Sequence, residues 1–183
     1  MLQVTKKGVK SLALIDGANI QKAFYAIGQR ADWAKIRDWL EGNFDMLRLN
    51  YYTALREEDD GEIKLHPLVN WLGFNGYSVV SKPAKRYTDN GVERTKGNMD
   101  IELATDMLML SSFVSQIFLF SGDADFSYVV REVQKRGVRV VAICTVRGNG
   151  SSLIADDLRK QCDGFIDIAE MPGWYQERKA AAQ

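Results

Sequence analysis

The stretch Leu12-Ala13-Leu14-Ile15-Asp16-Gly17-Ala18-Asn19 decides the fold of this chain. Its first four apolar residues are typical of a buried strand, and the glycine permits a tight turn into a helix that Asn19 can cap. A strand that turns directly into a helix is the start of a β-α-β unit. Asp16 then stands at the carboxyl end of a strand, which is where α/β sheets bind ligands.

Further strands and helices are predicted to alternate along the rest of the chain. Apolar runs suited to strands cover 11–15, 47–53, 77–80, 116–120, 138–144 and, more briefly, 164–168. Apolar residues have helical spacing in 33–40, 68–72, 101–110 and 126–133. This alternation predicts an α/β fold, a three-layer α/β/α sandwich with a mainly parallel central sheet.

Two further segments carry acids that a sheet of this kind can gather. In Lys96-Gly97-Asn98-Met99-Asp100, the aspartate stands in the first turn of a predicted helix, on the side that faces the core. In Ser121-Gly122-Asp123-Ala124-Asp125-Phe126, two aspartates follow the predicted strand 116–120 on a turn that opens a helix. A helix cap explains one of these two aspartates more easily than both.

The acids predict a metal site if the strands before Asp16 and Asp123 are neighbours. Carboxylates held close together raise one another's pKa, and a hard divalent cation with oxygen ligands relieves that repulsion. We therefore expect Mg²⁺ or Mn²⁺ to be held by Asp16, Asp100 and Asp123, with Asp125 coordinating through water or orienting a ligand. Capping of helices is the alternative for each acid alone, and Asp106 is a lower-ranked candidate.

A basic stretch leads directly into the Asp100 segment. Five cations and two acids lie between Lys82 and Lys96, and we predict a surface loop that holds nucleic-acid phosphates, with Tyr87 able to stack on a base. An ordinary solvated loop is the alternative. The cations expected to bind substrate are Lys85, Arg86, Arg94 and Lys96.

Length, composition and charge predict the domain organisation and the location of the protein. The 183 residues predict a single domain over 1–183, with a core over about 11–169 and a tail over 170–183. No apolar stretch approaches the roughly 20 residues of a membrane span, and no secretory signal is evident, so a cytoplasmic protein with no membrane partner is expected. Because 24 basic and 24 acidic residues balance, any nucleic-acid binding must be local.

Histidine and cysteine chemistry is largely excluded. The single histidine, His66, stands beside Pro67 before a helical segment and is expected to mark a helix entry. An imidazole zinc site or a Ser-His-Asp triad would need that one residue in the right place. Cys144 and Cys162 form no Cys-x-x-Cys motif, and both are expected to be core or near-core thiols.

Taken together, the acidic motifs resemble the NYN domain of the PIN-like nuclease superfamily, closest to its LabA-like members. The likeness is carried by 13–19, 96–100 and 121–126, followed by the strand start Gly137-Val138-Arg139-Val140, and it spans roughly Leu12 to Ile168. The resemblance implies a PIN-like sheet of order 3-2-1-4-5, in which the first and fourth strands are side by side.

The resemblance also implies a Mg²⁺- or Mn²⁺-dependent ribonuclease that acts on single-stranded or structured RNA, with endonucleolytic cutting the expectation and exonucleolytic cutting left open. Its implied catalytic positions are Asp16, Asp100, Asp123 and Asp125. Asn19 and Ser121 match the neighbouring polar positions of the family, and Lys96 matches its basic position. These three are expected to bind substrate.

The chain departs from several PIN-like nucleases beside the helix motif. Those proteins carry an extra acid there, whereas Asn98 and Met99 flank Asp100 in this chain, so Asp106 is left as the open candidate for that role. LabA-like proteins also resemble regulators. A non-catalytic RNA-binding regulator with a metal-stabilised acidic pocket is therefore the alternative, and a homo-oligomer is possible for either.

Overall fold

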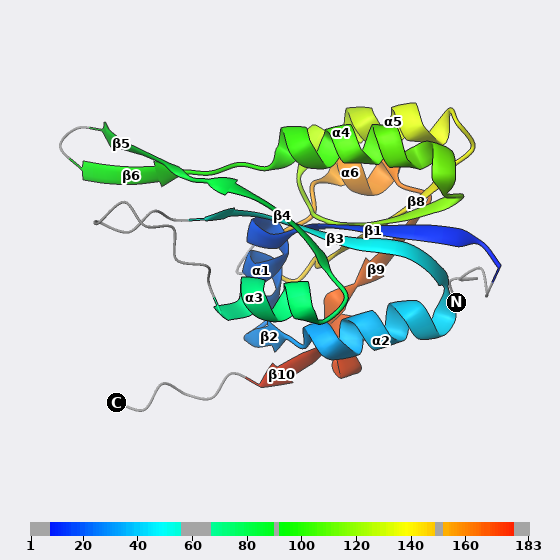
Figure 1. Cartoon of the computed structure of the whole chain (residues 1–183), viewed down its shortest axis with the longest axis horizontal. Coiled ribbons are helices and arrows are strands. Elements are labelled where there is room, and N and C mark those ends of the chain that lie inside the picture. Colours follow the sequence, from blue (N-terminus) through cyan, green and yellow to red (C-terminus); the bar gives the residue numbers. More distant parts are fainter. Residues whose placement is uncertain (1–7, 56–66, 90–91, 149–151, 178–183) are drawn as a thin grey trace.

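The computed structural model describes residues 8–55, 67–89, 92–148 and 152–177, and its centre is a six-stranded sheet (Figure 1). The strands of this sheet are β1 (Lys10–Asp16), β3 (Asp45–Leu55), β4 (Ser78–Pro83), β7 (Gln116–Phe120), β8 (Arg139–Cys144) and β9 (Gly164–Asp167). Their order is β4-β3-β1-β7-β8-β9, and every neighbouring pair is parallel. The first five core strands therefore follow the predicted order 3-2-1-4-5, and β9 extends the sheet at one edge.

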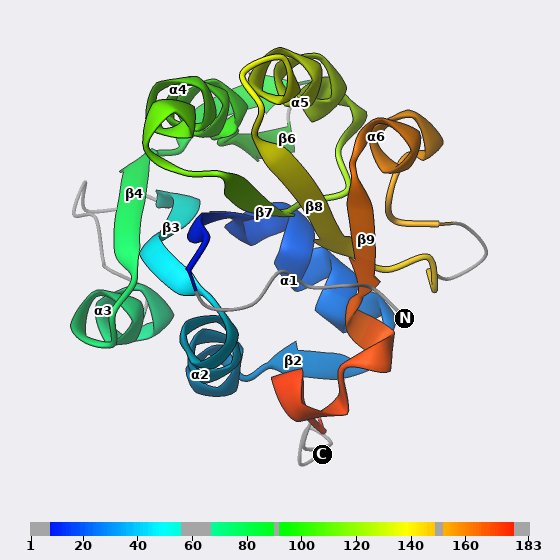
Figure 2. The same ribbon diagram turned by 90° about the vertical axis from the view of Figure 1, so that its right-hand side faces the viewer.

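Helices cover both faces of the sheet, which confirms the predicted three-layer architecture. On one side lie α4 (Asp100–Leu110), α5 (Ser127–Gln134) and α6 (Asp156–Gln161); on the other lie α1 (Gly17–Ala26), α2 (Trp33–Asn43) and α3 (Pro67–Phe74) (Figure 2). Within the described residues, the helical elements are completed by four short 3₁₀ turns: η1 (Ser111–Phe113), η2 (Ala124–Phe126), η3 (Ile168–Glu170) and η4 (Pro172–Trp174).

The core is centred on β1 and β7, because both strands are covered on their two faces. The apolar residues of β1 from Leu12 to Ile15 are fully buried, as are those of β7. On the α2 side, the Trp33 ring meets the Tyr51 ring edge-on at a centroid distance of 5.2 Å. Burial of these large apolar surfaces stabilises the packing of the sheet against the helices that cover it.

Two smaller strand pairs lie outside the main sheet. The strand β10 (Tyr175–Glu177) pairs with β2 (Gln29–Ala31), and in the preceding η4 Trp174 is only 2% exposed, with its ring 5.0 Å from that of Trp39. The tail therefore packs onto the body at least as far as β10.

The basic stretch is a hairpin, which corrects the predicted loop. The strands β5 (Lys85–Asp89) and β6 (Val92–Lys96) pair in antiparallel register and extend from the body of the domain beside the start of α4 (Figure 1). The sequence Asn90-Gly91 is a strong hairpin signal that the charge count obscured.

The cysteines behave as expected, while His66 lies outside the described residues. Burial raises the pKa of the Cys144 thiol to about 11 and that of Cys162 to about 12, so neither is a reactive thiolate. No helix in the described part of the chain has the length and apolar character to cross a bilayer.

Candidate metal centre

The strand order brings the predicted acids to one edge of the sheet. β1 and β7 pair in parallel with Ile15 opposite Phe120, so Asp16 and Ser121 follow side by side. The Ser121 hydroxyl donates a hydrogen bond to Oδ2 of Asp16 at 3.3 Å. This edge is the carboxyl end of the strands, at the left of the sheet in Figure 1, where parallel sheets bind ligands.

Asp16 is fixed at the start of α1. Its Oδ1 accepts a hydrogen bond from the backbone N–H of Asn19 at 3.1 Å, which caps the helix. The next residue has to be glycine, because a Cβ on Gly17 would lie 2.7 Å from the ring of Tyr51. The carboxylate is therefore held by both the cap and the close approach of β3.

The turn after β7 is held by side chains from two elements. The side-chain oxygen of Asn19 accepts a hydrogen bond from the backbone N–H of Gly122 at 3.0 Å. Ser121 Oγ accepts one from the backbone N–H of Asp123 at 3.2 Å, and Asp123 Oδ1 accepts one from that of Asp125 at 3.0 Å. Since Ser121 is fully buried, its hydroxyl orients the two aspartates it contacts and lies out of reach of an RNA chain.

Asp100 reaches the same edge from α4. Asn98 Oδ1 accepts a hydrogen bond from the backbone N–H of Asp100 at 2.7 Å, and the Asn98 amide donates back to Oδ2 of that carboxylate. A Cβ on Gly97 would overlap Ala54 Cβ and lie 3.1 Å from Ala84 Cβ. This glycine therefore lets the segment pass close to β3 and deliver Asp100 to the edge.

The acids converge. Asp100, Asp123 and Asp125 each offer a carboxylate oxygen, and these oxygens lie within 4.8 Å of one another. Asp16 lines a cavity of about 270 Å³ together with Asp100 and Asp123. The structure thus brings all four predicted acids to one place, with Asp125 inside the tight group and Asp16 on the wall of the adjoining cavity.

The electrostatics of the cluster fit a divalent cation. Burial raises the pKa of Asp16, and the charges of Asp100 and Asp123 add to the effect. Burial likewise raises the pKa of Asp100, which Asp123 and Asp125 raise further and Lys82 lowers. Donors that are all carboxylate oxygens suit Mg²⁺ or Mn²⁺ and not a soft metal. A cation of this kind would relieve the repulsion that the residues alone leave in place.

The other predicted residues either lie outside the acidic cluster or have side chains that the structure does not describe. Asp106 is outside the cluster, because its Oδ2 accepts a hydrogen bond from the Tyr52 hydroxyl at 2.7 Å. The side chains of the four predicted substrate-binding cations lie outside the described part of the chain, and only their backbones are placed, on β5 and β6. Those cations are Lys85, Arg86, Arg94 and Lys96.

Two lysines that were not predicted as site residues stand beside the acids. Lys22 of α1 lines the cavity with Asp16. Lys82 of β4 lines a neighbouring cavity of about 940 Å³ with Asp100 and pairs with Glu102 at 2.6 Å. The signal for Lys22 was its position three residues after Asn19, on the same face of the helix. The sequence placed Lys82 at the start of the basic stretch and contained no sign that it would approach Asp100.

Replacing Asp16 with Asn is expected to stabilise the metal-free protein. A carboxyl whose pKa is raised by folding binds its proton more tightly in the folded state, so the free energy of unfolding falls as pH rises from the ordinary value of 3.8 toward the raised one. Asparagine keeps the cap and removes the charge. In EDTA at pH 7, Tm should therefore rise by about 2–4 °C for each kcal/mol regained.

The pH dependence of Tm distinguishes the loss of the Asp16 charge from a gain in packing as the source of the added stability. Below pH 3.8, where the carboxyl is protonated in both states, wild type and Asp16→Asn should melt together. A difference in Tm of the same size at pH 7 and at low pH would show that the charge of Asp16 is not its source.

Comparisons with known proteins agree on the family. The model of the NYN domain family matches residues 11–169. The chain is 26% identical over 168 residues to the low amplitude and bright protein LabA of Synechococcus elongatus, and the alignment covers 89% of this chain and 86% of the relative.

A solved structure agrees on the fold. The crystal structure of a protein of unknown function from Vibrio parahaemolyticus superposes with a TM-score of 0.71, at 21% identity, over 96% of this chain and 100% of the other. At that identity the likeness supports the PIN-like fold alone.

Proposed function

This chain belongs to the NYN domain family, and from that premise we propose that it is a divalent-metal-dependent ribonuclease that hydrolyses RNA phosphodiester bonds. The observation that carries the proposal is the convergence of Asp100, Asp123 and Asp125 within 4.8 Å at the carboxyl edge of the sheet. An acidic cluster repels a phosphodiester unless cations neutralise it. The proposal therefore requires the metal as well as the acids.

Each of the four aspartates has its own role in the proposed reaction. Asp100 and Asp123 would hold the ion, with Asp16 as the third ligand and Asp125 orienting a coordinated group. A bound Mg²⁺ or Mn²⁺ lowers the pKa of its water and stabilises negative charge on the attacked phosphate. Ser121 donates a hydrogen bond to the Asp16 carboxylate and accepts one from the backbone N–H of Asp123, so it fixes one ligand and the turn that carries the other before substrate arrives.

Cations at the rim would hold the RNA backbone. Lys22 lines the acidic cavity and Lys82 the adjoining one, so an RNA strand bound at the cluster would pass near both lysines. The hairpin β5–β6 carries the basic stretch beside the start of α4, where it could extend this contact (Figure 1).

Replacing Lys22 with Ala is expected to weaken binding of single-stranded RNA equally for all sequences. One lost phosphate contact should reduce the slope of log K against log salt concentration by about 0.7. The measurement is fluorescence anisotropy of labelled oligonucleotides over a range of salt. Lys10→Ala, an exposed lysine at the opposite end of β1, is the matched control and should leave the slope unchanged. An unchanged slope in Lys22→Ala would remove this residue from the RNA path.

The proposed function is tested by incubating the purified protein with single-stranded RNA in Mg²⁺, in Mn²⁺ and in EDTA. Cleavage that requires the metal and is lost in EDTA is the expected result. Binding without any metal-dependent product would favour the alternative, a non-catalytic RNA-binding regulator. A circular single-stranded RNA separates the two modes of cutting, because an endonuclease linearises it whereas an exonuclease has no end from which to start.

A further inference from the structure

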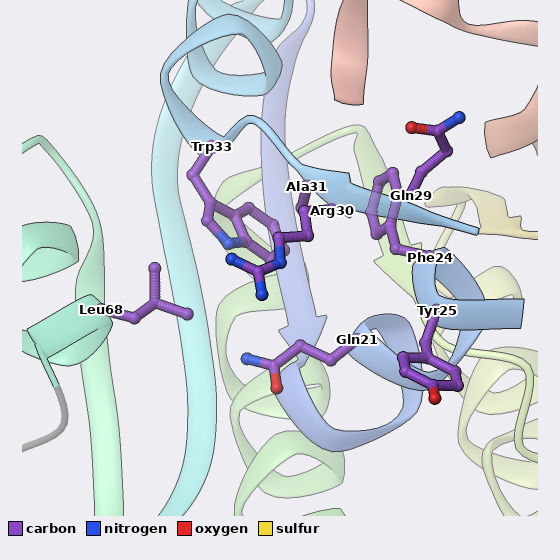
Figure 3. A pocket seen from close by; sticks show the side chains of 8 residues that line it. All are labelled: Gln21, Phe24, Tyr25, Gln29, Arg30, Ala31, Trp33 and Leu68. Carbon is purple, nitrogen blue, oxygen red and sulfur yellow. The ribbon is translucent and has the colours of Figure 1, made fainter. Parts of the chain in front are cut away.

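A second cavity lies along α1, away from the acidic cluster. It has a volume of about 430 Å³, within the range of small-ligand pockets, and is bounded by α1, β2, the start of α2 and α3. Figure 3 shows Leu68 of α3 on one side and Trp33, Arg30 and Gln21 facing it from the other. None of these residues belongs to the proposed metal centre.

The apolar part of the cavity is aromatic. Phe24 and Trp33 are almost fully buried, at 1% and 5% exposure, and form part of its wall. Tyr25 also lines the cavity and is 63% exposed. The two buried rings give the cavity an apolar wall, and the exposed Tyr25 ring can stack on a flat ligand such as a nucleobase.

One charged side chain of the cavity has no partner. Among the residues that the structure describes, the Arg30 guanidinium has no hydrogen-bond or ion-pair partner, although the backbone of Arg30 pairs with β10. The buried side-chain oxygen of Gln29 likewise has no hydrogen-bond partner in the described part of the chain. The Arg30 guanidinium can donate to the acceptor atoms on the edge of a nucleobase, whereas the neighbouring Gln29 side chain points away from it (Figure 3).

A hydrogen bond and a ring contact link the wall of this cavity to the acidic centre. Gln21 Nε2 donates a hydrogen bond to the Tyr51 hydroxyl at 2.8 Å, and the Tyr51 ring packs under Gly17, the residue after Asp16. Gln21 is five residue steps along α1 from its N-cap Asp16, which is about 8 Å at 1.5 Å per residue. One or two nucleotides of an extended strand can span this distance.

We propose that this cavity binds a nucleobase of the same RNA strand whose phosphate lies at the acidic centre. The inference rests on the proposed function, since it takes RNA as the ligand, and it adds a place for one unstacked base. Such a base is available in single-stranded or looped RNA and is hidden inside a continuous duplex. The enzyme would therefore select single-stranded segments by capturing a base one or two nucleotides from the cut.

The test is a binding experiment in Ca²⁺ instead of Mg²⁺ or Mn²⁺, because Ca²⁺ also takes carboxylate ligands and neutralises the acids, while its larger and more flexible coordination is expected not to support cleavage. A labelled single-stranded oligoribonucleotide and a series with one abasic position moved along it are titrated with wild type, Arg30→Ala and Tyr25→Ala. In wild type, abasic substitution at one position should weaken binding about tenfold, the scale of one stacked base. Both variants should bind the intact oligonucleotide about tenfold more weakly and should lose the dependence on that position.

The matched control is Arg48→Ala, which removes an exposed arginine near the amino end of β3, far from the cavity in sequence and on another element. It should keep the position dependence of wild type. An abasic profile that is the same in wild type and in Arg30→Ala would overturn the base pocket, even if the protein cleaves RNA. Position-dependent binding without any cleavage in Mn²⁺ would instead overturn the nuclease and leave the base pocket standing.

Discussion

Replacing Asp123 with Asn is expected to lower metal-dependent RNA cleavage by about a thousandfold. Asp123 is in the tight group with Asp100 and Asp125, and like Asp100 it also lines the cavity of Asp16, so it contributes to both arrangements. Loss of several kcal/mol of transition-state stabilisation by the metal corresponds to about three orders of magnitude in rate. Initial rates with a fluorogenic single-stranded RNA in Mn²⁺ measure the effect.

The substitution is nearly isosteric and should leave the fold intact, because the asparagine oxygen can still accept the hydrogen bond from the backbone N–H of Asp125. Asp45→Asn is the matched control, since Asp45 is an exposed acid at the first residue of β3, at the opposite edge of the sheet. It should cleave RNA at the wild-type rate. Full activity in Asp123→Asn would mean that the cluster does not carry the chemistry.

Replacing Gly122 with Ala is expected to cost both stability and activity. A Cβ at this position would overlap the carbonyl oxygen of Leu153 and would lie 2.9 Å from both Cys144 Sγ and Ile154 Cα. Backbone atoms cannot move aside as a flexible side chain can, so the cost should be about 3 kcal/mol, a fall in Tm of about 6–12 °C. Activity should fall as well, because Gly122 directly precedes Asp123.

Gly42→Ala is the matched control, because it adds a Cβ to a glycine that has open space around it. Gly42 lies in α2 with nothing within 4 Å of the added Cβ, so alanine should stabilise the helix by about 0.5–1 kcal/mol. Thermal melting of both variants beside wild type gives the comparison. A Gly122→Ala protein that melts at the wild-type temperature would show that the turn after β7 has room to adjust, and that its packing does not fix Asp123.

Much of the fold could be predicted from local sequence signals. The apolar runs of β1 and β7 are fully buried and lack the alternation of an exposed sheet, so they predicted central strands of a parallel sheet. The order of the strands is not contained in such signals. It came from the resemblance carried by the acidic motifs, and the structure agrees with it.

Site residues that directly follow a strand could be predicted from the sequence. Residues whose approach to the site depends on tertiary contacts were missed. Asp16 and Asp123 could be placed because their strands end directly before them. Lys82 could not, because its approach to Asp100 depends on how β4 lies relative to α4. The cavity containing Arg30 depends on the pairing of β2 with the distant β10, which no local pattern encodes.

An anomalous difference map from a crystal soaked in Mn²⁺ tests directly whether these aspartates bind a metal. We expect a manganese peak within bonding distance of carboxylate oxygens of Asp100 and Asp123, on the side of the cavity lined by Asp16. The peak should be absent from Asp123→Asn crystals soaked in the same way. A well-ordered wild-type site with no manganese at these carboxylates would show that the acidic cluster is not a metal centre.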